Sequence, residues 1–401
     1  MRISTTSAHE QALYHMMNQQ SQLSQTQQKL ATGKRMLAPA DDPAGAARAM
    51  DLSNAIARLE QFKRNTDTAQ GRLELTESTI AGIIDALQRI RELTVQANND
   101  SQDPTSRKAI AIEIKQRLDQ LVQAANTQDA NGEYLFSGHQ TSTLPFVAGP
   151  SGFIYQGDQG QRLTEIADGR KIAIGEAGSE LFQRIANGNG VFATSPATTN
   201  AGSGVIDIGT VTNQAAWIAD DYTLTFTAAN SYEVRDSSGG LVTTGAYQSG
   251  TAISFLGISL TITGTPASMD NFAISSSQSQ DIFSTVQSIY DETLASGAGG
   301  TTSLASTAQL HSALGRGLSE LDQILDHLNE SRARIGSRLT EIDDQREINS
   351  GTQIQLTRLK SEIEDLDYAS AISKMNRQLL GLQAAQQSFS KIQNLSLFNY
   401  L

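Results

Sequence analysis

The 401-residue sequence contains no cysteine and one tryptophan, and only 5% of its residues are aromatic. Without cysteine, the chain can form no disulfide, no thiolate metal site and no cysteine nucleophile. This absence also suits a protein that leaves the cell without becoming cross-linked. Hydrophobic residues make up 38% of the chain, which is little core for an enzyme of this length. Helices that each bury a single stripe would account for the shortage.

Positive charge is scarce as well, because 30 Lys and Arg stand against 42 Asp and Glu, a net charge of −12. Such a surface would not neutralise phosphates, so we expect no nucleic-acid partner. We also expect no membrane partner, since no basic amphipathic run and no apolar span occurs. Residues 1–6 lead into a Gln-rich segment without an apolar core or a cleavage site, which is not a secretory signal peptide. The expected location is therefore the cytoplasm, or outside the cell by an export route without a cleaved signal.

Residues for catalysis are missing from the sequence. The five histidines are scattered, and no HExxH, P-loop, GxSxG or strand-linked GxGxxG motif occurs. Asp343 and Asp344 lie in the middle of a helical pattern, where a solvated face is their expected role. We therefore predict no enzymatic activity, no catalytic or metal-binding residues and no cofactor.

What the sequence does contain is a stripe of apolar residues at each end, spaced by three and four as in a coiled coil. Neither stripe is broad enough to be buried on all sides, so each needs a partner helix. The simplest interpretation is that the two ends pair with each other or with other copies of the chain. The predicted subunit contacts, called here the terminal contact residues, are Leu13, Met16, Leu23, Leu30, Ile363, Leu366, Ile372, Met375, Leu379, Leu382, Phe389, Ile392 and Leu395.

Helix boundaries are signalled by glycine and proline. The first helix, over residues 10–31, should end where Gly33 can cap it. Asp42 before Pro43 is typical of an N-cap with proline at the first helical position. A metal or catalytic site from Asp41 and Asp42 is the alternative, but no third ligand lies nearby. The long helix that follows should end near Asn98, and Pro104 should open a third helix.

The pattern changes at Asn131. Residues 134–277 hold 14 of the 22 aromatic residues, and short β-type runs alternate there with Gly, Asp and Asn turns. Within this stretch, residues 187–204 are expected to form an exposed loop. The three runs that best fit strands are 153–155, 222–226 and 258–262.

The helical period returns after Ser279, and we expect a joint at Ser350-Gly351 before the terminal helix. We predict a mainly α fold, an antiparallel coiled-coil bundle of long helices formed by both chain ends, with an inserted all-β domain. Arg332, Arg346 and Asn349 occupy seam positions, where polar residues can fix helix alignment. The predicted domains are a terminal segment 1–48 that pairs with 352–401, a helical core from 49–133 and 278–351, and the β insert 134–277.

Several segments resemble the bacterial flagellin superfamily, namely Met1-Arg2-Ile3-Ser4, the residues Asp41, Asp42, Pro43 and Gly45, and the closing Leu397-Phe398-Asn399-Tyr400-Leu401. Flagellins usually carry Asp-Asp-Ala-Ala-Gly at the second of these, and the proline here is more similar to the hook–filament junction branch. Segments 131–138 and 155–158 add to this similarity, which covers residues 1–182 and 279–401. Residues 255–275 are similar to a strand motif of hook-associated proteins, although Met269 replaces its usual Gly. Residues 187–250 match no family that we can name.

The resemblance implies a structural protein of the bacterial flagellum that forms the junction between the hook-associated ring and the flagellin filament. Its terminal segments would be disordered in the free monomer and form coiled-coil helices on assembly. The implied partners are copies of itself in a ring, the preceding hook-associated junction protein, flagellin and an export chaperone. The implied location is extracellular, in the flagellum, after type III export, with a role in motility. Flagellin itself is the near alternative, and a secreted coiled-coil adhesin is a more remote one.

Overall fold

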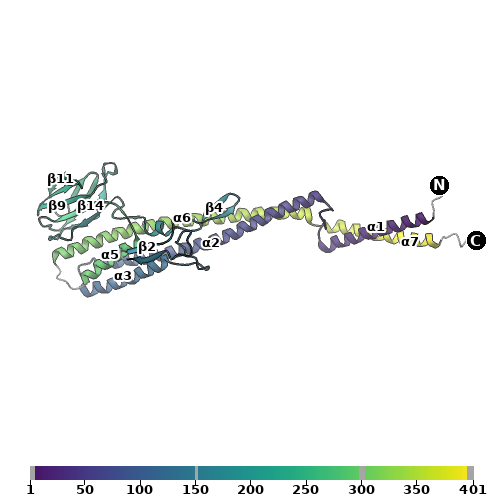
Figure 1. The fold of residues 1–401 in the computed structure, drawn as a ribbon, viewed down its shortest axis with the longest axis horizontal. Helices are drawn as coiled ribbons and strands as arrows, with labels where there is room; N and C mark the ends of the chain where they lie inside the picture. The colour runs from purple at the N-terminus through teal and green to yellow at the C-terminus, as the bar shows by residue number, and fades with distance from the viewer. Residues whose placement is uncertain (1–4, 150–151, 298–302, 395–401) are drawn as a thin grey trace, which may run out of the picture. The chain divides into compact units, whose positions relative to one another are not determined.

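The computed structural model describes residues 5–149, 152–297 and 303–394 (Figure 1). Leu395, the first four residues and the closing motif 397–401 lie outside the described residues. The helices are α1 (Thr5–Thr32), α2 (Pro43–Ala97), α3 (Pro104–Ala125), α4 (Gly178–Phe182), the 3-10 helix η1 (Gln214–Ala216), α5 (Ile282–Gly297), α6 (Leu304–Glu364) and α7 (Tyr368–Asn394). The strands are β1 (Phe146–Gly149), β2 (Gly152–Tyr155), β3 (Leu163–Ala167), β4 (Arg170–Ala173), β5 (Ile185–Ala186), β6 (Phe192–Pro196), β7 (Val205–Ile206), β8 (Thr210–Val211), β9 (Tyr222–Ala228), β10 (Ser231–Arg235), β11 (Leu241–Ala246), β12 (Ala252–Phe255), β13 (Ile258–Thr263), β14 (Asn271–Ser276) and β15 (Ser279–Gln280).

The chain divides into two compact units. The terminal unit consists of residues 1–64 and 345–401, and the central unit consists of residues 65–344. In the terminal unit α1 and α7 lie side by side (Figure 1). They are antiparallel, since the rings of His9 and Phe389 are 4.5 Å apart while Thr26 Oγ1 donates to Gln378 Oε1 at 2.8 Å.

The predicted helix boundaries are confirmed at three positions. Helix α1 ends at Thr32, followed by Gly33 with φ of 68°, where a residue with a Cβ atom would be strained. Helix α2 begins at Pro43, and α3 begins at Pro104. Asp103 caps α3 by accepting a hydrogen bond from Ser106 N at 2.6 Å.

The joint expected at Ser350-Gly351 is wrong in position. Helix α6 runs through both residues and ends at Glu364, and the turn before α7 lies at residues 365–367. A single glycine on an exposed helix position lowers stability by only about 1 kcal/mol relative to alanine. Gly351 is exposed, and the remaining contacts of α6 outweigh that small loss.

A hydrophobic core in the central unit joins α2, α3, α5 and α6. Segments between the helices add to it, and the ring of Phe146 lies 5.5 Å from Phe182 and 5.1 Å from Phe283. The fully or largely buried residues from these segments are Leu135, Phe136, Phe146, Ile166, Ile172, Ile174, Leu181, Phe182 and Ile185.

A second hydrophobic core belongs to the strands between residues 192 and 274. Its five-stranded sheet has the order β11-β10-β9-β14-β6, and β13 pairs with β12, β7 and β8. The runs predicted at 222–226 and 258–262 are confirmed as β9 and β13, and the run at 153–155 is part of β2. The only tryptophan of the sequence, Trp217, packs against this core.

The expected exposed loop at residues 187–204 is wrong, because it contains β6. Phe192 is fully buried there, and β6 pairs with β14 at the edge of the sheet. The Gly and Asn residues before Phe192 suggested a loop, but the partner strand lies about eighty residues away in sequence. Just before this region, Asn187 N donates to Gln278 O at 2.9 Å, and Gln278 N donates to Asn187 Oδ1 at 2.8 Å. We call this pair of bonds the clasp.

Met269 occupies a left-handed turn with φ of 74°, at the position where the similar motif usually has glycine. A side chain in this conformation costs roughly 1–2 kcal/mol. The turn is held nonetheless, since the carboxylate of Asp270 accepts hydrogen bonds from Ala201 N, Gly202 N and Ala267 N at 2.8–3.0 Å. Met269 itself is exposed and does not disturb the core.

Candidate assembly interface

The terminal contact residues lie on α1, on the end of α6, in the turn after it and on α7. Among those whose side chains the structure describes, Leu23 is buried, and Leu13, Leu379 and Ile372 are 42%, 39% and 46% exposed. The others are half-buried, except that Ile392 is described only by its place in α7 and Leu395 lies outside the described residues. The contact between α1 and α7 therefore leaves part of the predicted stripe open to solvent, at Leu13, Ile372 and Leu379.

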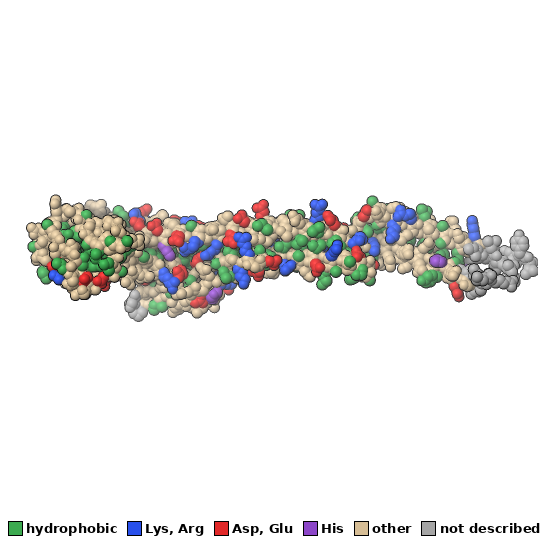
Figure 2. Space-filling view, turned by 90° about the horizontal axis from the view of Figure 1, so that it is seen from above, with side chains coloured by type: hydrophobic (Ala, Val, Ile, Leu, Met, Phe, Trp, Pro, Cys, Tyr) green, Lys and Arg blue, Asp and Glu red, His purple; other side chains and the backbone are tan. Residues whose placement is uncertain are grey.

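Other exposed apolar side chains of the terminal unit were not predicted as contacts. They stand beside the three-four ladder rather than on it, so a search for coiled-coil spacing passes over them. Figure 2 shows hydrophobic side chains at the surface among charged ones. The additional exposed residues include Tyr14, Met17, Met50, Ile348, Ile354 and Leu380.

The motif Asp41-Asp42-Pro43-Ala44-Gly45 forms the turn between α1 and α2. Asp42 Oδ1 accepts a hydrogen bond from Gly45 N at 3.0 Å, which caps α2 as predicted, and Asp42 Oδ2 pairs with Arg35 at 3.1 Å. Asp41 Oδ2 accepts from Leu37 N at 2.9 Å and lies 3.3 Å from Lys29 Nζ. Both carboxylates are thus engaged in shaping the turn.

This turn is tied to the turn between α6 and α7. Arg35 N donates to Glu364 O at 2.8 Å, and Leu366 N donates to Gly33 O at 2.9 Å. A Cβ atom on Gly45 would lie 2.5 Å from Asp42 Oδ2 and would displace the capping carboxylate, and one on Gly33 would lie 2.8 Å from the Tyr368 hydroxyl. The two turns therefore form one hydrogen-bonded joint.

Hydrogen bonds shift the two motif carboxylates toward their charged form. The Gly45 amide, followed by the charge of Arg35, lowers the pKa of Asp42 below its ordinary value of 3.8. The Leu37 amide, followed by Lys29, lowers the pKa of Asp41 in the same direction. Each carboxylate stabilises the folded joint above its ordinary pKa, and this contribution is lost as the pH falls toward the lowered pKa.

We expect Asp42→Asn to melt at a lower temperature than the unchanged chain at neutral pH, because the amide keeps the cap but loses the charge. The difference should shrink as the pH falls below 3.8 and disappear once the pH is below the lowered pKa of Asp42, where the carboxylate of the unchanged chain is protonated as well. Thermal melting followed by far-ultraviolet circular dichroism measures both chains. Asp51→Asn, on an exposed α2 residue that forms no ion pair within the described part of the chain, should show no difference at either pH. A difference for Asp42→Asn that persists in acid would contradict the assignment.

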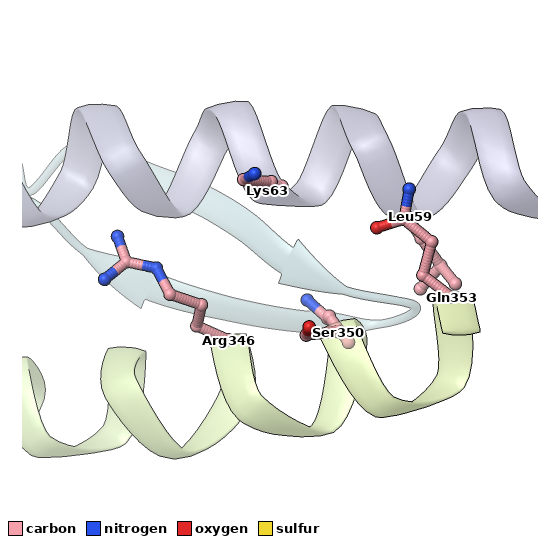
Figure 3. A pocket seen from close by; sticks show the side chains of 6 residues that line it. Leu59, Lys63, Arg346, Ser350 and Gln353 are labelled. Atoms are coloured by element: carbon pink, nitrogen blue, oxygen red, sulfur yellow. The ribbon is translucent and has the colours of Figure 1, made fainter. Parts of the chain in front are cut away.

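A small cavity of about 180 Å³ lies between α2 and α6 within the terminal unit (Figure 3). Lys63 from α2 and Arg346 from α6 line it, together with Leu59, Asn349 and Gln353. Asn349 is buried as the seam position predicted, and Gln345 Nε2 donates to its Oδ1 at 2.9 Å. The side chains that line this cavity are mostly polar, and they form no catalytic arrangement.

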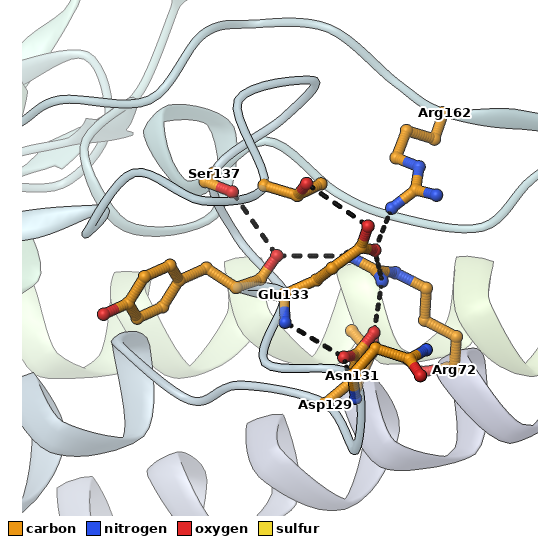
Figure 4. Close-up of polar contacts among 9 residues, drawn as sticks. Arg72, Asp129, Asn131, Glu133, Ser137 and Arg162 are labelled. Carbon is orange, nitrogen blue, oxygen red and sulfur yellow. Dashed lines mark hydrogen bonds and ion pairs between the residues drawn. The ribbon is translucent and has the colours of Figure 1, made fainter.

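A cluster of charged side chains in the central unit holds the segment that begins at Asn131 (Figure 4). Arg72 Nη1 lies 2.7 Å from Asp129 Oδ2 and 3.0 Å from Glu133 Oε2, and its Nη2 donates to Tyr134 O at 3.1 Å. Arg162 pairs with Glu133 from the other side. Burial lowers the pKa of the Arg72 guanidinium and Arg162 adds to this effect, while the two carboxylates raise it.

The segment 155–158 is joined to residues 136–139. The Tyr155 hydroxyl donates toward Phe136 O and Asp158 O at 2.9 and 2.8 Å, and burial raises the pKa of Tyr155 to about 12. Asp158 Oδ1 accepts from His139 N at 2.9 Å. The two segments that added to the sequence resemblance are therefore parts of one structural tie rather than a reactive site.

No set of three or more acidic or histidine side chains within the described ranges could hold a metal ion. In the same ranges, no helix is both long and apolar enough to cross a membrane. What the geometry offers is a surface with exposed apolar side chains and, in the same unit, a hydrogen-bonded joint.

Residues 3–141 match the bacterial flagellin N-terminal helical region, and residues 318–401 match the bacterial flagellin C-terminal helical region. FlgL from Xanthomonas campestris is 32% identical, with a TM-score of 0.73 over 77% of this chain and 99% of that chain. The flagellar junction protein FlgL from Legionella pneumophila is 30% identical, with a TM-score of 0.72 over 79% of this chain and 99% of that chain. Flagellar hook-associated protein 3 of Salmonella typhimurium is 32% identical over 185 residues, or 46% of this chain.

The chain belongs to the flagellar hook-associated protein 3 family, within the bacterial flagellin superfamily. The aligned part spans 58% of the length of the Salmonella typhimurium hook-associated protein 3. Membership in the hook-associated protein 3 family makes this chain a component of the bacterial flagellum, located outside the cell. The motif residues 41–45 and the segments 131–138 lie in the part that matches the flagellin N-terminal region.

Proposed function

We propose that this chain is a structural subunit that joins the hook-associated ring to the flagellin filament. The observation that carries the proposal is its likeness to FlgL proteins across 99% of their solved chains. A filament subunit is the less favoured alternative, because these solved relatives are FlgL proteins and one of them is a flagellar junction protein. In this role the chain acts by assembly and catalyses no reaction.

The proposed mechanism is that segments 1–48 and 352–401 form a coiled coil with each other and with neighbouring copies in a ring. The exposed apolar residues on α1 and α7 support it, since burying apolar surface contributes about 25 cal/mol per Å². The preceding hook-associated protein would bind one side of the ring and flagellin the other. An export chaperone would cover the same stripe on α7 before assembly.

A single charged substitution tests this role. In cells that lack their own hook-associated protein 3, we expect this chain to restore filaments on intact hooks. Leu379→Asp should reduce the number of filaments at least tenfold, because an unpaired charge buried in an interface costs several kcal/mol. The thermal midpoint of the purified chain should change little, since Leu379 is already 39% exposed. Filaments are counted by electron microscopy.

Gln383→Asp is the matched control, since this exposed α7 residue lies outside the terminal contact residues. It should leave the filament number within twofold of the unchanged chain. Normal filaments with Leu379→Asp would show that the stripe is not an assembly surface. Hooks that stay bare even with the unchanged chain would refute the junction role itself.

A further inference from the structure

The two units carry charges of opposite sign. Residues 1–64 and 345–401 contain 14 Lys and Arg against 10 Asp and Glu, a net charge of +4. Residues 65–344 contain 16 Lys and Arg against 32 Asp and Glu, a net charge of −16. The terminal unit, which holds the proposed assembly surface, is thus the cationic part of an anionic chain.

Part of this positive charge surrounds a cavity of about 260 Å³ beside the start of α7, which we call the joint pocket. Three cations line it, Lys29, Arg35 and Lys374, against one carboxylate, Asp367. The carboxylate is occupied, because Asp367 Oδ1 accepts from Ser370 N at 3.1 Å and Oδ2 from Ser370 Oγ at 2.7 Å.

The cations are engaged to different degrees. Lys29 lies 3.3 Å from Asp41, and Arg35 lies 3.1 Å from Asp42. Lys374 has no hydrogen bond or ion pair within the described part of the chain. Backbone hydrogen bonds hold the joint that carries Arg35, so the pocket has its shape without a ligand, which reduces the entropy lost on binding. Of the three cations in the pocket, Lys374 is therefore the one that is not paired with a carboxylate in the described part of the chain.

We propose that the joint pocket binds an acidic side chain of a second copy of this chain. The proposal rests on the proposed function, in which copies assemble through the terminal unit. Copies with a net charge of −12 repel one another unless some of their acidic groups meet cations across the interface. The terminal unit offers such groups, since Asp51, Glu60 and Glu347 are exposed and form no ion pair within the described residues.

Charge reversal in the pocket is the first test. In cells lacking their own hook-associated protein 3, Lys374→Glu should reduce filament number at least tenfold, whereas Lys374→Arg should stay within twofold of the unchanged chain. Lys391→Glu makes the same charge change on an exposed α7 residue outside the pocket, and it should also stay within twofold. The purified Lys374→Glu chain should melt at the unchanged temperature.

Each other result overturns the proposal. Equal losses for Lys374→Glu and Lys391→Glu would point to net charge alone, and a lowered melting temperature for Lys374→Glu would point to folding. Filaments restored by Lys374→Glu as well as by the unchanged chain would remove the pocket but leave the junction role standing. If the unchanged chain restores none, both proposals fail together.

A carbodiimide, which joins an amine directly to a carboxylate, identifies the occupant. In isolated hook–filament preparations we expect Lys374 joined to Asp51, Glu60 or Glu347, in a product of twice the 43.0 kDa chain mass. The purified monomer should not yield this product. Lys374 joined only to Asp367 of its own chain, or to flagellin, would rule out a second copy as the occupant.

Discussion

Arg72→Met is expected to lower the free energy of unfolding of the central unit by about 3–5 kcal/mol, the usual loss when one partner of a buried charge pair is removed. The Arg72 side chain is only 7% exposed and holds Asp129 and Glu133 together with the Tyr134 carbonyl. Its removal leaves two carboxylates facing each other with only Arg162 for compensation. Urea unfolding followed by far-ultraviolet circular dichroism measures the loss.

Arg89→Met is the matched control on the same helix. Arg89 also pairs with two carboxylates, Glu92 and Glu113, both at 2.9 Å, but its side chain is 42% exposed. Solvent screens such pairs, so the loss should be at least threefold smaller than for Arg72→Met. Fluorescence of Trp217 follows the unfolding of the second core separately, because that core contains neither arginine. Equal losses for the two variants would show that burial of the cluster contributes nothing.

Deleting the strand region should have the second large effect on stability. The size of this effect depends on which residues are removed. We propose that the separable unit is residues 188–277, because the second core lies within it and the clasp joins its two ends. Replacing these residues with Asn-Gly would close β5 and β15 into a hairpin, for which this dipeptide is a preferred turn. The shortened chain should keep its helices and melt cooperatively.

Replacing residues 134–277, the predicted insert, should instead abolish cooperative melting. That cut removes Phe136, Phe146 and Phe182 from the helical core, and each buried Phe contributes about 3–5 kcal/mol. Their combined loss is comparable to the total stability of about 5–15 kcal/mol that a domain possesses. Circular dichroism melting distinguishes the two deletions. If both melt alike, the aromatic residues before Asn187 are not needed by the helices.

The sequence predicts those features that local chemistry decides. Gly33 after α1, Asp42 before Pro43 and Pro104 mark helix ends because their backbone preferences act within one turn. The strands β9 and β13 are likewise visible as β-branched and aromatic runs. The motif at residues 41–45 is visible in the sequence, but its role in the joint depends on residues more than three hundred positions away.

Features decided by distant partners are not predictable in this way. The turn at 365–367 is held by Gly33 and Arg35, whereas the glycine at position 351 is the stronger local signal for a break. The assignment of the aromatic residues before Asn187 to the helical core depends on Phe283, far along the chain. For the proposed interface, the three-four spacing selects the terminal contact residues, but it does not select the exposed Tyr14 and Met17 beside them on α1.

The clasp also affects which insertions and deletions the chain can tolerate. Asn187 and Gln278 are hydrogen-bonded to each other. The two ends of the segment between them are therefore held close together. Loop-closure entropy grows only with the logarithm of loop length, so doubling this stretch costs about 0.6 kcal/mol. Large insertions or deletions there should therefore be nearly neutral for the helices. Insertions or deletions within residues 134–186 would instead destabilise the helices, because that segment contributes to their core.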